Sequence, residues 1–422
     1  KSYISPLHPS KSVEIRRLQP LATGVLGRPG GARILHREAG LMARLPRRSG
    51  LRGLNLRVIM AIIGVALLWW SLMSVSDGYT PIRGNKGKVL VSYSYFEKDD
   101  IQTRNFDFFI TTAMGVDNVL DKPHNIDFVV VQSGDACEPC KRLLQSMKAA
   151  DNALSEVRQV YESVSGPGRV TLLQRKENEG MDFAAHNITL EYLLAQGRLK
   201  QYKYVILLNS SVRGPFVPSY MPEGWQWPQA YTSRLVGDVH VVSSSLVCLP
   251  EVDLGGHGPK LESWAAAVDQ EGLRVLMDEG VFAIRTCKLC KDGIVVKGEY
   301  GLSAAMTKHG YTFDTLMSKY RKVDWRDRAN WNCNNNVHPS RHGTYDGLSM
   351  HPFETVFVKA SWHVGGPFVD KYAEWMTAQA LGNPTTRGAF DEPMYRYAVS
   401  MEAQKDPHVE QCYKVLDRDK GQ

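Results

Sequence analysis

Three neutral polar residues, Asn209-Ser210-Ser211, directly follow the apolar run Tyr204–Leu208. A run of this length suits a buried strand, and Gly214-Pro215 ends regular structure soon afterwards. Open α/β sheets bind ligands at the carboxyl ends of their strands, so these groups are candidates for ligand contact. Alternatively, Asn209 is an ordinary turn residue whose side-chain amide forms its hydrogen bonds with neighbouring residues. Amide and hydroxyl groups are poor ligands for Mg²⁺ or Mn²⁺, so the three residues do not by themselves form a metal site.

A second polar group precedes the helix expected at Asn187–Ala195. Asn178 and Gly180 lie in a turn, where a glycine permits a positive φ. Asp182 follows them and is either a ligand contact or an ordinary residue of a helix start. Farther along, Gly298-Glu299 opens a helix that continues to His309. Glu299 is a candidate general base, and its alternative is an acid favoured by the helix dipole.

Apolar runs and helical patterns alternate from residue 88 onward. Strands are expected at Lys88–Tyr95, Ile126–Gln132, Val170–Leu173 and Tyr204–Leu208, and helices around Asn105–Met114, at Lys141–Val164 and at Asn187–Ala195. This alternation predicts an α/β fold with a mostly parallel sheet and helices on both faces. Beyond Pro250 the weaker pattern favours helices at Glu262–Asp269, Leu273–Asp278 and Asp314–Tyr320, and a long polar loop at Asp324–Met350.

The positive charge is concentrated at the start of the chain. Residues 1–57 contain twelve Lys or Arg and two acidic residues, so the remaining 365 residues carry a net charge of −3. This distribution gives no case for a nucleic-acid-binding domain. The basic segment has little apolar periodicity and is expected to be disordered.

Nineteen uncharged residues, 58–76, follow this basic segment. Their length fits one membrane-spanning helix, and the positive-inside rule then places residues 77–422 in a lumen. A signal anchor fits better than a cleaved signal peptide, which has a shorter apolar region. An organelle transit peptide remains an alternative, as does a buried core helix.

Seven cysteines are present, including the pairs Cys137/Cys140 and Cys287/Cys290, with Cys248, Cys333 and Cys412 elsewhere. The two CxxC pairs are too far apart for a usual zinc site. Disulfides are expected, while free thiols and a redox or metal role remain alternatives. Because seven is odd, at least one thiol is unpaired within the chain.

Several of these segments resemble motifs of GT-A glycosyltransferases. Asn178-Glu-Gly180-Met-Asp182-Phe183-Ala184 resembles the N-x-G-x-x-x-A turn, and Asn209-Ser-Ser211 stands where such enzymes carry DxD. The helix from Glu299 to Gly310-Tyr311 is similar to the one that holds their catalytic carboxylate, although Tyr300 stands where an Asp is common. Residues 88–360 are most similar to the rhamnan-synthesis-type branch and its eukaryotic relatives, which combine N-x-G-x-D-F with LLN-S-x-x-G-P-F.

The resemblance implies a Rossmann-like GT-A domain with a nucleotide-sugar donor site. The implied donor-binding residues are Arg175, Asn178, Gly180, Asp182, Asn209, Ser211 and Arg213, with Glu299 as the catalytic base. A diphosphate leaving group needs a metal or fixed donors. Because DxD is absent, no metal ligand is assigned. Either a divalent cation (Mn²⁺ or Mg²⁺) is held from elsewhere, or Arg213, Arg175 and Lys359 neutralise the phosphates.

The polar loop supplies candidates for the acceptor side. Asp324, Trp325 and Arg326 are assigned there, and His338, His342 and His351 are further candidates without a metal-site spacing. The segment His351–Glu354 either closes the donor site or is a packed loop. The sequons at Asn187 and Asn209 fall within the expected site, so neither is expected to be glycosylated.

These inferences predict a single-pass type II membrane glycosyltransferase of the Golgi that moves a sugar from a nucleotide-sugar to a glycan or glycoprotein. The expected segments are a cytosolic tail at 1–57, a transmembrane signal anchor at 58–76, a stem at 77–87, a GT-A-like domain at 88–405 and a C-terminal tail at 406–422. One alternative is a membrane-anchored carbohydrate-binding or scaffold protein on a degenerate transferase fold. Another is a nucleotide-binding or redox protein, which the lack of GxGxxG disfavours.

Overall fold

The computed structural model describes residues 87–120, 123–163, 168–286, 291–360, 366–383 and 392–405. The chain divides into two units, Lys1–Tyr79 and Thr80–Gln422, and every described residue belongs to the second. The tail expected at 1–57, the membrane span at 58–76, the stem up to residue 86 and the tail at 406–422 lie outside the described residues. Within the described part, no helix combines the length and the apolar character that crossing a bilayer requires.

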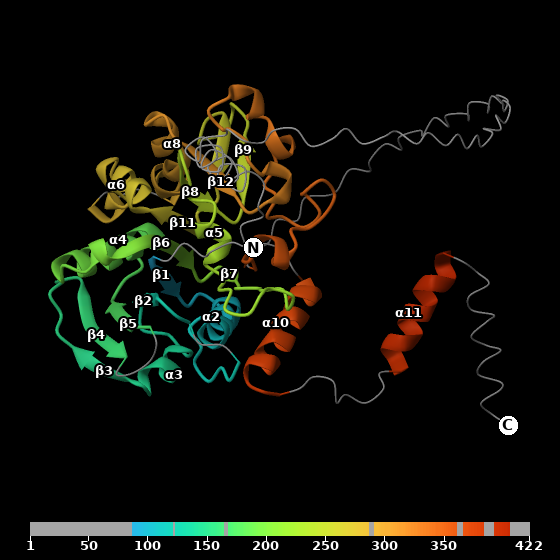
Figure 1. Cartoon of the computed structure of the whole chain (residues 1–422), viewed down its shortest axis with the longest axis horizontal. Helices are drawn as coiled ribbons and strands as arrows, with labels where there is room; N and C mark the ends of the chain where they lie inside the picture. The colour runs from blue at the N-terminus through green and yellow to red at the C-terminus, as the bar shows by residue number, and fades with distance from the viewer. Residues whose placement is uncertain are drawn as a thin grey trace, which may run out of the picture. The chain divides into compact units, whose positions relative to one another are not determined.

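A nine-stranded sheet is the centre of the second unit (Figure 1). In spatial order its strands are β12 (Thr312–Thr315), β8 (Val239–Ser243), β11 (Ala265–Asp269), β6 (Tyr202–Asn209), β1 (Lys88–Phe96), β2 (Ile126–Ser133), β5 (Val170–Arg175), β4 (Val157–Ser163) and β3 (Met147–Ala150). β11 and β4 run opposite to the other seven strands of the sheet. The expected mixed α/β fold with a mostly parallel sheet is confirmed.

Two short ladders and a set of helices complete the described part. The ladders pair β9 (Leu246–Leu249) with β10 (Gly258–Leu261), and β7 (Val212–Arg213) with β13 (Val358–Lys359). The helices are α2 (Asp100–Thr112), α3 (Cys140–Leu144), α4 (Met181–Ala195), α5 (Gln229–Thr232), α6 (Gln270–Asp278), α7 (Lys291–Ile294), α8 (Gly301–Lys308), α9 (Pro352–Thr355), α10 (Gly366–Ala380) and α11 (Glu392–Lys405). A π-helical turn, Val295–Glu299, joins α7 to α8. Short 3₁₀ turns occur at Leu199–Gln201, Ala283–Thr286, Ser318–Tyr320, Arg328–Asn330 and Cys333–Asn336.

Strand β1 lies between helices on both faces of the sheet, because alternate side chains of a strand point to opposite sides. Tyr93 stacks on Phe106 of α2, with ring centroids 4.8 Å apart. Ser92, one residue earlier, contacts His186 and Thr189 of α4. This burial on both sides explains the nearly continuous apolar character of β1 and β2.

The helix expected at Lys141–Val164 is wrong. The structure has only the short helix α3 there, followed by the antiparallel strands β3 and β4. In β4 the buried residues Val157 and Val160 are three apart, because the pairing with β5 shifts register between Val157 and Gln159. An irregularity of this kind gives a strand the apparent spacing of a helix.

Two further helix predictions are wrong, and both segments contribute strands instead. Glu262–Asp269 contains β11, whose run Ala265-Ala266-Ala267-Val268 is fully buried between β6 and β8. Alanine favours helices in isolation, but a central position with close neighbours overrides that preference. The segment Asp314–Tyr320 contains the end of β12 and a 3₁₀ turn.

Four cysteines form two disulfides, Cys137–Cys140 and Cys248–Cys333. This supports the disulfide interpretation for these four residues. Cys287, Cys290 and Cys412 lie outside the described residues. The second bond joins β9 to the polar loop after β12, across a separation of 85 residues. It therefore fixes part of that loop against the β9–β10 ladder.

Candidate active site

The carboxyl ends of β1 and β6 bring three polar residues together at the start of α4. The Asn209 amide donates to an Asp182 oxygen at 2.7 Å, and the Ser94 hydroxyl donates to the other at 3.2 Å. The Ser211 backbone N–H donates to the Asn209 side-chain oxygen at 3.0 Å. The amide orientation is therefore fixed from both sides. Burial raises the pKa of Asp182, and the bonds from Asn209 and Ser94 oppose that rise.

The turn before α4 is held in place by Arg175, at the end of β5. The buried guanidinium donates to the Ser133 hydroxyl at 2.7 Å, to the Glu179 carbonyl at 2.9 Å and to the Asn178 side chain at 3.2 Å. Gly180 has a φ of 68° at the helix start, a conformation that a glycine adopts without strain. Arg175 thus positions the turn that carries Asp182, and its contacts are with the chain itself.

Lys359 reaches the same region from the β7–β13 ladder. The ladder pairs Lys359 with Val212 and Val358 with Arg213. Arg213 donates to Asn105 at 2.9 Å and forms an ion pair with Asp370 of α10. Lys359 instead interacts electrostatically with three carboxyl groups, those of Asp182, Glu262 and Glu299. We call these four residues the lysine–carboxylate cluster.

Glu262 is the carboxyl group of the cluster whose pKa is lowered. Its side chain is only 2% exposed and accepts hydrogen bonds from Ser245, from Ser340 at 2.9 Å and from His338 at 3.3 Å. Burial alone would raise the pKa of Glu262. The bond from His338 and the positive charge of Lys359 outweigh burial and hold that pKa at about 2.

The pKa of Glu299 shifts in the opposite direction from that of Glu262. It is half-buried at the end of the π-helical turn Val295–Glu299, immediately before α8. Burial raises the pKa of Glu299, and the neighbouring negative charge of Glu262 adds to the rise, while Lys359 and His338 oppose it. A carboxyl group with a raised pKa beside one with a lowered pKa is the arrangement in which the two take different proton-transfer roles. The pKa shifts thus suit Glu299 for proton exchange, as they do Asp182, and the Asp182 oxygens are already occupied by the bonds from Asn209 and Ser94.

The described residues contain no group of three His, Cys, Asp or Glu side chains placed to hold a metal ion. In the lysine–carboxylate cluster the Lys359 ammonium is the positive charge that the carboxyl groups share. The amide and hydroxyl groups of Asn209-Ser210-Ser211 are poor ligands for a divalent cation, and the chemistry below uses the chain's own charges.

The tripeptide assigned to the acceptor side lies outside the lysine–carboxylate cluster. Trp325 is fully buried and stacks on Phe313, and its backbone N–H donates to the hydroxyl of Thr312, the first residue of β12. Arg326 binds Asp324 and Asp238, and Asp238 immediately precedes β8. Asp324, Trp325 and Arg326 are thus at the amino ends of β8 and β12. The structure does not bring them to the lysine–carboxylate cluster.

Glu262 was not identified from the sequence, and its partners His338 and Ser340 lie 76 and 78 residues away. No local pattern links residues at that separation, and the surrounding segment was interpreted as helix. For Lys359, the sequence indicated only a cation that follows the buried Val358. For Ser94, it indicated nothing beyond a position near the end of a predicted strand.

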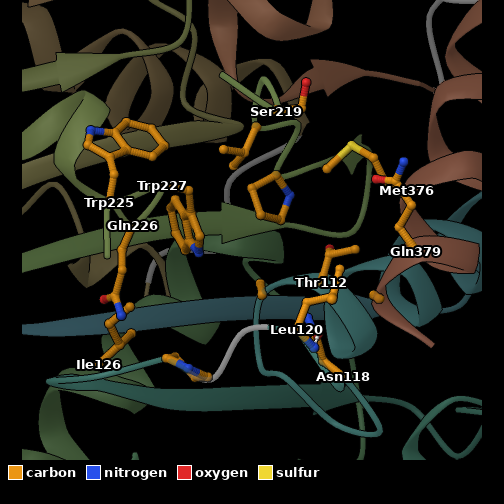
Figure 2. A pocket seen from close by; sticks show the side chains of 15 residues that line it. Thr112, Asn118, Leu120, Ile126, Ser219, Trp225, Gln226, Trp227, Met376 and Gln379 are labelled. Carbon is orange, nitrogen blue, oxygen red and sulfur yellow. Dashed lines mark hydrogen bonds between the residues drawn. The ribbon is translucent and has the colours of Figure 1, made fainter. Parts of the chain in front are cut away.

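A separate pocket of about 180 Å³ has a different character. Figure 2 shows Trp225, Gln226 and Trp227 on one side of it and Met376 and Gln379 of α10 on the other. No charged residue is among the described residues that line it. With no titratable group in its wall, this pocket has no means of moving a proton.

Comparison with known proteins gives only remote likenesses. No family model matches the chain, and no curated protein matches it. One similar solved structure is the mannosyltransferase PcManGT from Pyrobaculum calidifontis in complex with GDP-Man and Mn²⁺, at 14% identity over 83% of this chain and 92% of that one, with a TM-score of 0.33.

Two further solved structures are similar at the same level. One is a glycosyltransferase involved in glycosylating the major capsid of PBCV-1, at 10% identity over 68% of this chain and 98% of that one, with a TM-score of 0.29. The other is the glycosyltransferase GlyE of Streptococcus pneumoniae TIGR4, at 8% identity over 72% and 67%, with a TM-score of 0.33. At these TM-scores the likeness assigns no function to this chain.

Proposed function

We propose that this protein is a glycosyltransferase that uses a nucleotide-sugar donor. The observation that carries the proposal is the lysine–carboxylate cluster at the carboxyl ends of β1 and β6, with Asn209 locked onto Asp182. Ligands of open α/β sheets bind at that edge. The motif resemblance of the Asn178–Ala184 turn, the Asn209–Ser211 segment and the Glu299 helix supports it, because Asp182 is bonded to Asn209 and shares the charge of Lys359 with Glu299.

The proposed reaction is a single displacement at the anomeric carbon. An acceptor hydroxyl oxygen bonds to that carbon, and the bond from the carbon to the diphosphate breaks. Glu299 takes the proton of the attacking hydroxyl, and the nucleoside diphosphate leaves with the electron pair. Lys359 meets the negative charge that develops on the leaving group, in the role that fixed cations have in such sites. The configuration at the anomeric carbon is inverted.

The donor end is formed by Asp182, Asn209 and Ser211, with Arg175, Asn178 and Gly180 shaping the turn beneath them. Asp182 accepts a hydrogen bond from the base or ribose of the nucleotide. Arg213 faces the opposite side of the β7–β13 ladder, toward Asp370, so Lys359 replaces it as the phosphate-facing cation in this proposal.

We also propose that the enzyme is a type II protein of the Golgi membrane, with its catalytic domain in the lumen. The uncharged stretch 58–76 after a basic segment supports one span, and the two disulfides support an oxidising compartment. The acceptor in this proposal is a glycan or glycoprotein.

A second candidate function is sugar binding without transfer, on a fold that has lost its chemistry. The neutral Asn209-Ser210-Ser211 segment favours it, because no carboxylate stands there to recruit a metal. The two candidates differ in whether the donor is consumed.

The test is to express the protein in a secretory host and incubate it with a panel of nucleotide-sugars. Donor binding is measured by calorimetry, and release of the nucleoside diphosphate is measured with and without a chelator. Glu299→Gln is expected to retain donor binding and lose at least about 100-fold in turnover, the scale of general-base catalysis. Asp182→Asn is expected to weaken donor binding.

Matched controls are Glu251→Gln and Asp151→Asn, which make the same chemical changes at exposed positions. Both should behave as the wild type does. Binding without turnover in the wild type would favour the second candidate. No binding to any donor of the panel would reject both the site and the transferase.

A further inference from the structure

A second pocket lies between α8, strand β10 and the loop that carries Arg326, Arg328 and Trp331. Its volume is about 410 Å³, and its lining includes His257, Lys260, Lys308, Arg326, Arg328 and Trp331. Five of these side chains are basic or can become so, and no acidic residue is among the described residues that line it. Since residues 58–422 carry a net charge of −3, this concentration of cations is local.

Two of the cations have no ion-pair partner in the part of the chain that the structure describes. Lys308 is paired with Glu279, and Arg326 with Asp238 and Asp324. Lys260 and Arg328 form no such pair with described residues. Burial lowers the pKa of Lys260, with only a partial offset from the charge of Asp253. A concave surface that holds unneutralised cations is complementary to an anion.

The pocket wall that contains Arg328 and Trp331 is also held in place by the surrounding structure. The Arg328 guanidinium lies over the Trp331 ring, 5.1 Å from its centroid, and the Trp331 ring nitrogen donates to the Trp325 carbonyl at 2.9 Å. Gly258 permits this packing, because a Cβ there would lie 2.6 Å from the Trp331 ring. The Cys248–Cys333 disulfide holds the same loop against β9. Arg328 is thus presented by an anchored segment.

Helix α8, which follows Glu299 directly along the chain, supplies part of the pocket wall. Ser303 and Thr307, four and eight residues after Glu299, both line it. Ser303 and Thr307 are four residues apart within α8, so they share one face of that helix, and a rise of about 1.5 Å per residue places Thr307 roughly 6 Å beyond Ser303. A bound chain of sugar units could therefore extend from Glu299 toward the unpaired cations.

We propose that this pocket binds the acceptor, and that the acceptor is an anionic saccharide whose carboxylate or sulfate groups contact Lys260 and Arg328. The role as acceptor subsite rests on the proposed transferase function, whereas binding of the anionic saccharide does not.

The test measures binding of four probes to the full-length protein: chitotetraose (neutral), a hyaluronan tetrasaccharide (carboxylated), a chondroitin sulfate tetrasaccharide (sulfated) and inorganic sulfate. The wild type is expected to bind at least one anionic tetrasaccharide at least ten times more tightly than chitotetraose or sulfate. The Lys260→Met/Arg328→Gln variant is expected to lose that preference, and the affinity should fall as salt rises.

The control variant is Lys148→Met/Lys200→Gln, which removes two exposed cations outside the pocket and leaves the same net charge. Equal binding by the two double variants would overturn the proposal, as would equal binding of neutral and anionic tetrasaccharides. If inorganic sulfate bound as tightly as the anionic tetrasaccharide, the pocket would be a simple anion site, and the proposal that it recognises a saccharide would be rejected. Donor binding by the same preparations reports separately on the proposed function.

Discussion

At the scale of single residues, the cluster depends on one ammonium group shared by three carboxyl groups. Lys359 lowers the pKa of Asp182, Glu262 and Glu299, in each case against burial. The outcome differs between the three because the hydrogen bonds differ. Glu262 receives three side-chain donors, whereas Glu299 receives a backbone hydrogen bond from Ser263. Local donors therefore decide in which direction the pKa of each carboxyl group moves.

Replacing Lys359 by methionine should shift the pH dependence of turnover. Loss of the positive charge raises the pKa of Glu299 further, and a general base works only when ionised. The acidic limb of the pH–rate profile should therefore move up by about one pH unit. Plateau turnover should fall about 100-fold with the lost leaving-group stabilisation. Lys359→Arg, which keeps the charge, should leave the limb in place. If the acidic limb does not move in the Lys359→Met variant, the charge of Lys359 does not set the pKa of Glu299.

Glu262→Gln should reduce stability in a pH-dependent way. The folded-state pKa of Glu262 is about 2, below the ordinary value of 4.5, so its stabilisation is present above pH 4.5 and is lost as pH falls toward 2. The shift corresponds to at most about 3 kcal/mol. Urea unfolding at pH 7, 4 and 3 should show the difference from the wild type shrinking with pH. A constant difference would point to packing instead of charge.

At the scale of elements, Glu299 depends on how closely its π-helical turn approaches α4. A Cβ at Gly298 would lie 2.7 Å from the side chain of Phe183 in α4 and 2.7 Å from that of Ile284 in the turn Ala283–Thr286. Gly298→Ala should therefore displace the turn, reduce stability by about 1–3 kcal/mol and lower turnover while donor binding persists. Gly301→Ala is the matched control, because its nearest neighbour would be at 3.3 Å. Equal kinetics for the two variants would show that the turn tolerates the methyl group.

The central parallel strands were predictable from the sequence, and the antiparallel strands β4 and β11 were not. β1, β2, β5 and β6 are apolar runs buried on both faces, so the sequence pattern carries their signal. β4 and β11 were mistaken for helices, because an irregular pairing in one and alanines in the other imitate helical patterns. Asp182 and Asn209 were predictable because they lie near the carboxyl ends of those central strands, whereas Glu299 and Lys359 were named only through the motif resemblance. Glu262 joins the cluster through contacts between distant segments.

At the scale of the whole molecule, the two disulfides should contribute very unequally. The stabilisation from loss of unfolded-chain entropy grows with the length of chain that is closed. Cys248–Cys333 spans 85 residues and Cys137–Cys140 spans three. Cys333→Ser should therefore lower the free energy of unfolding by about 4 kcal/mol, and Cys137→Ser by clearly less. Chemical unfolding under non-reducing conditions measures both. Similar losses would show that local packing, and not chain closure, sets the effect.

The β7–β13 ladder makes the cluster and α10 mechanically dependent on each other. Val358 and Arg213 are paired in the ladder beside Lys359 and Val212, and Arg213 is tied to Asp370 of α10. A ligand that draws Lys359 toward itself must either break this two-residue ladder or carry Arg213 with it. In the second case the pull reaches the first turns of α10. Occupancy of the cluster should then be visible at a distance, as altered amide hydrogen exchange along that helix.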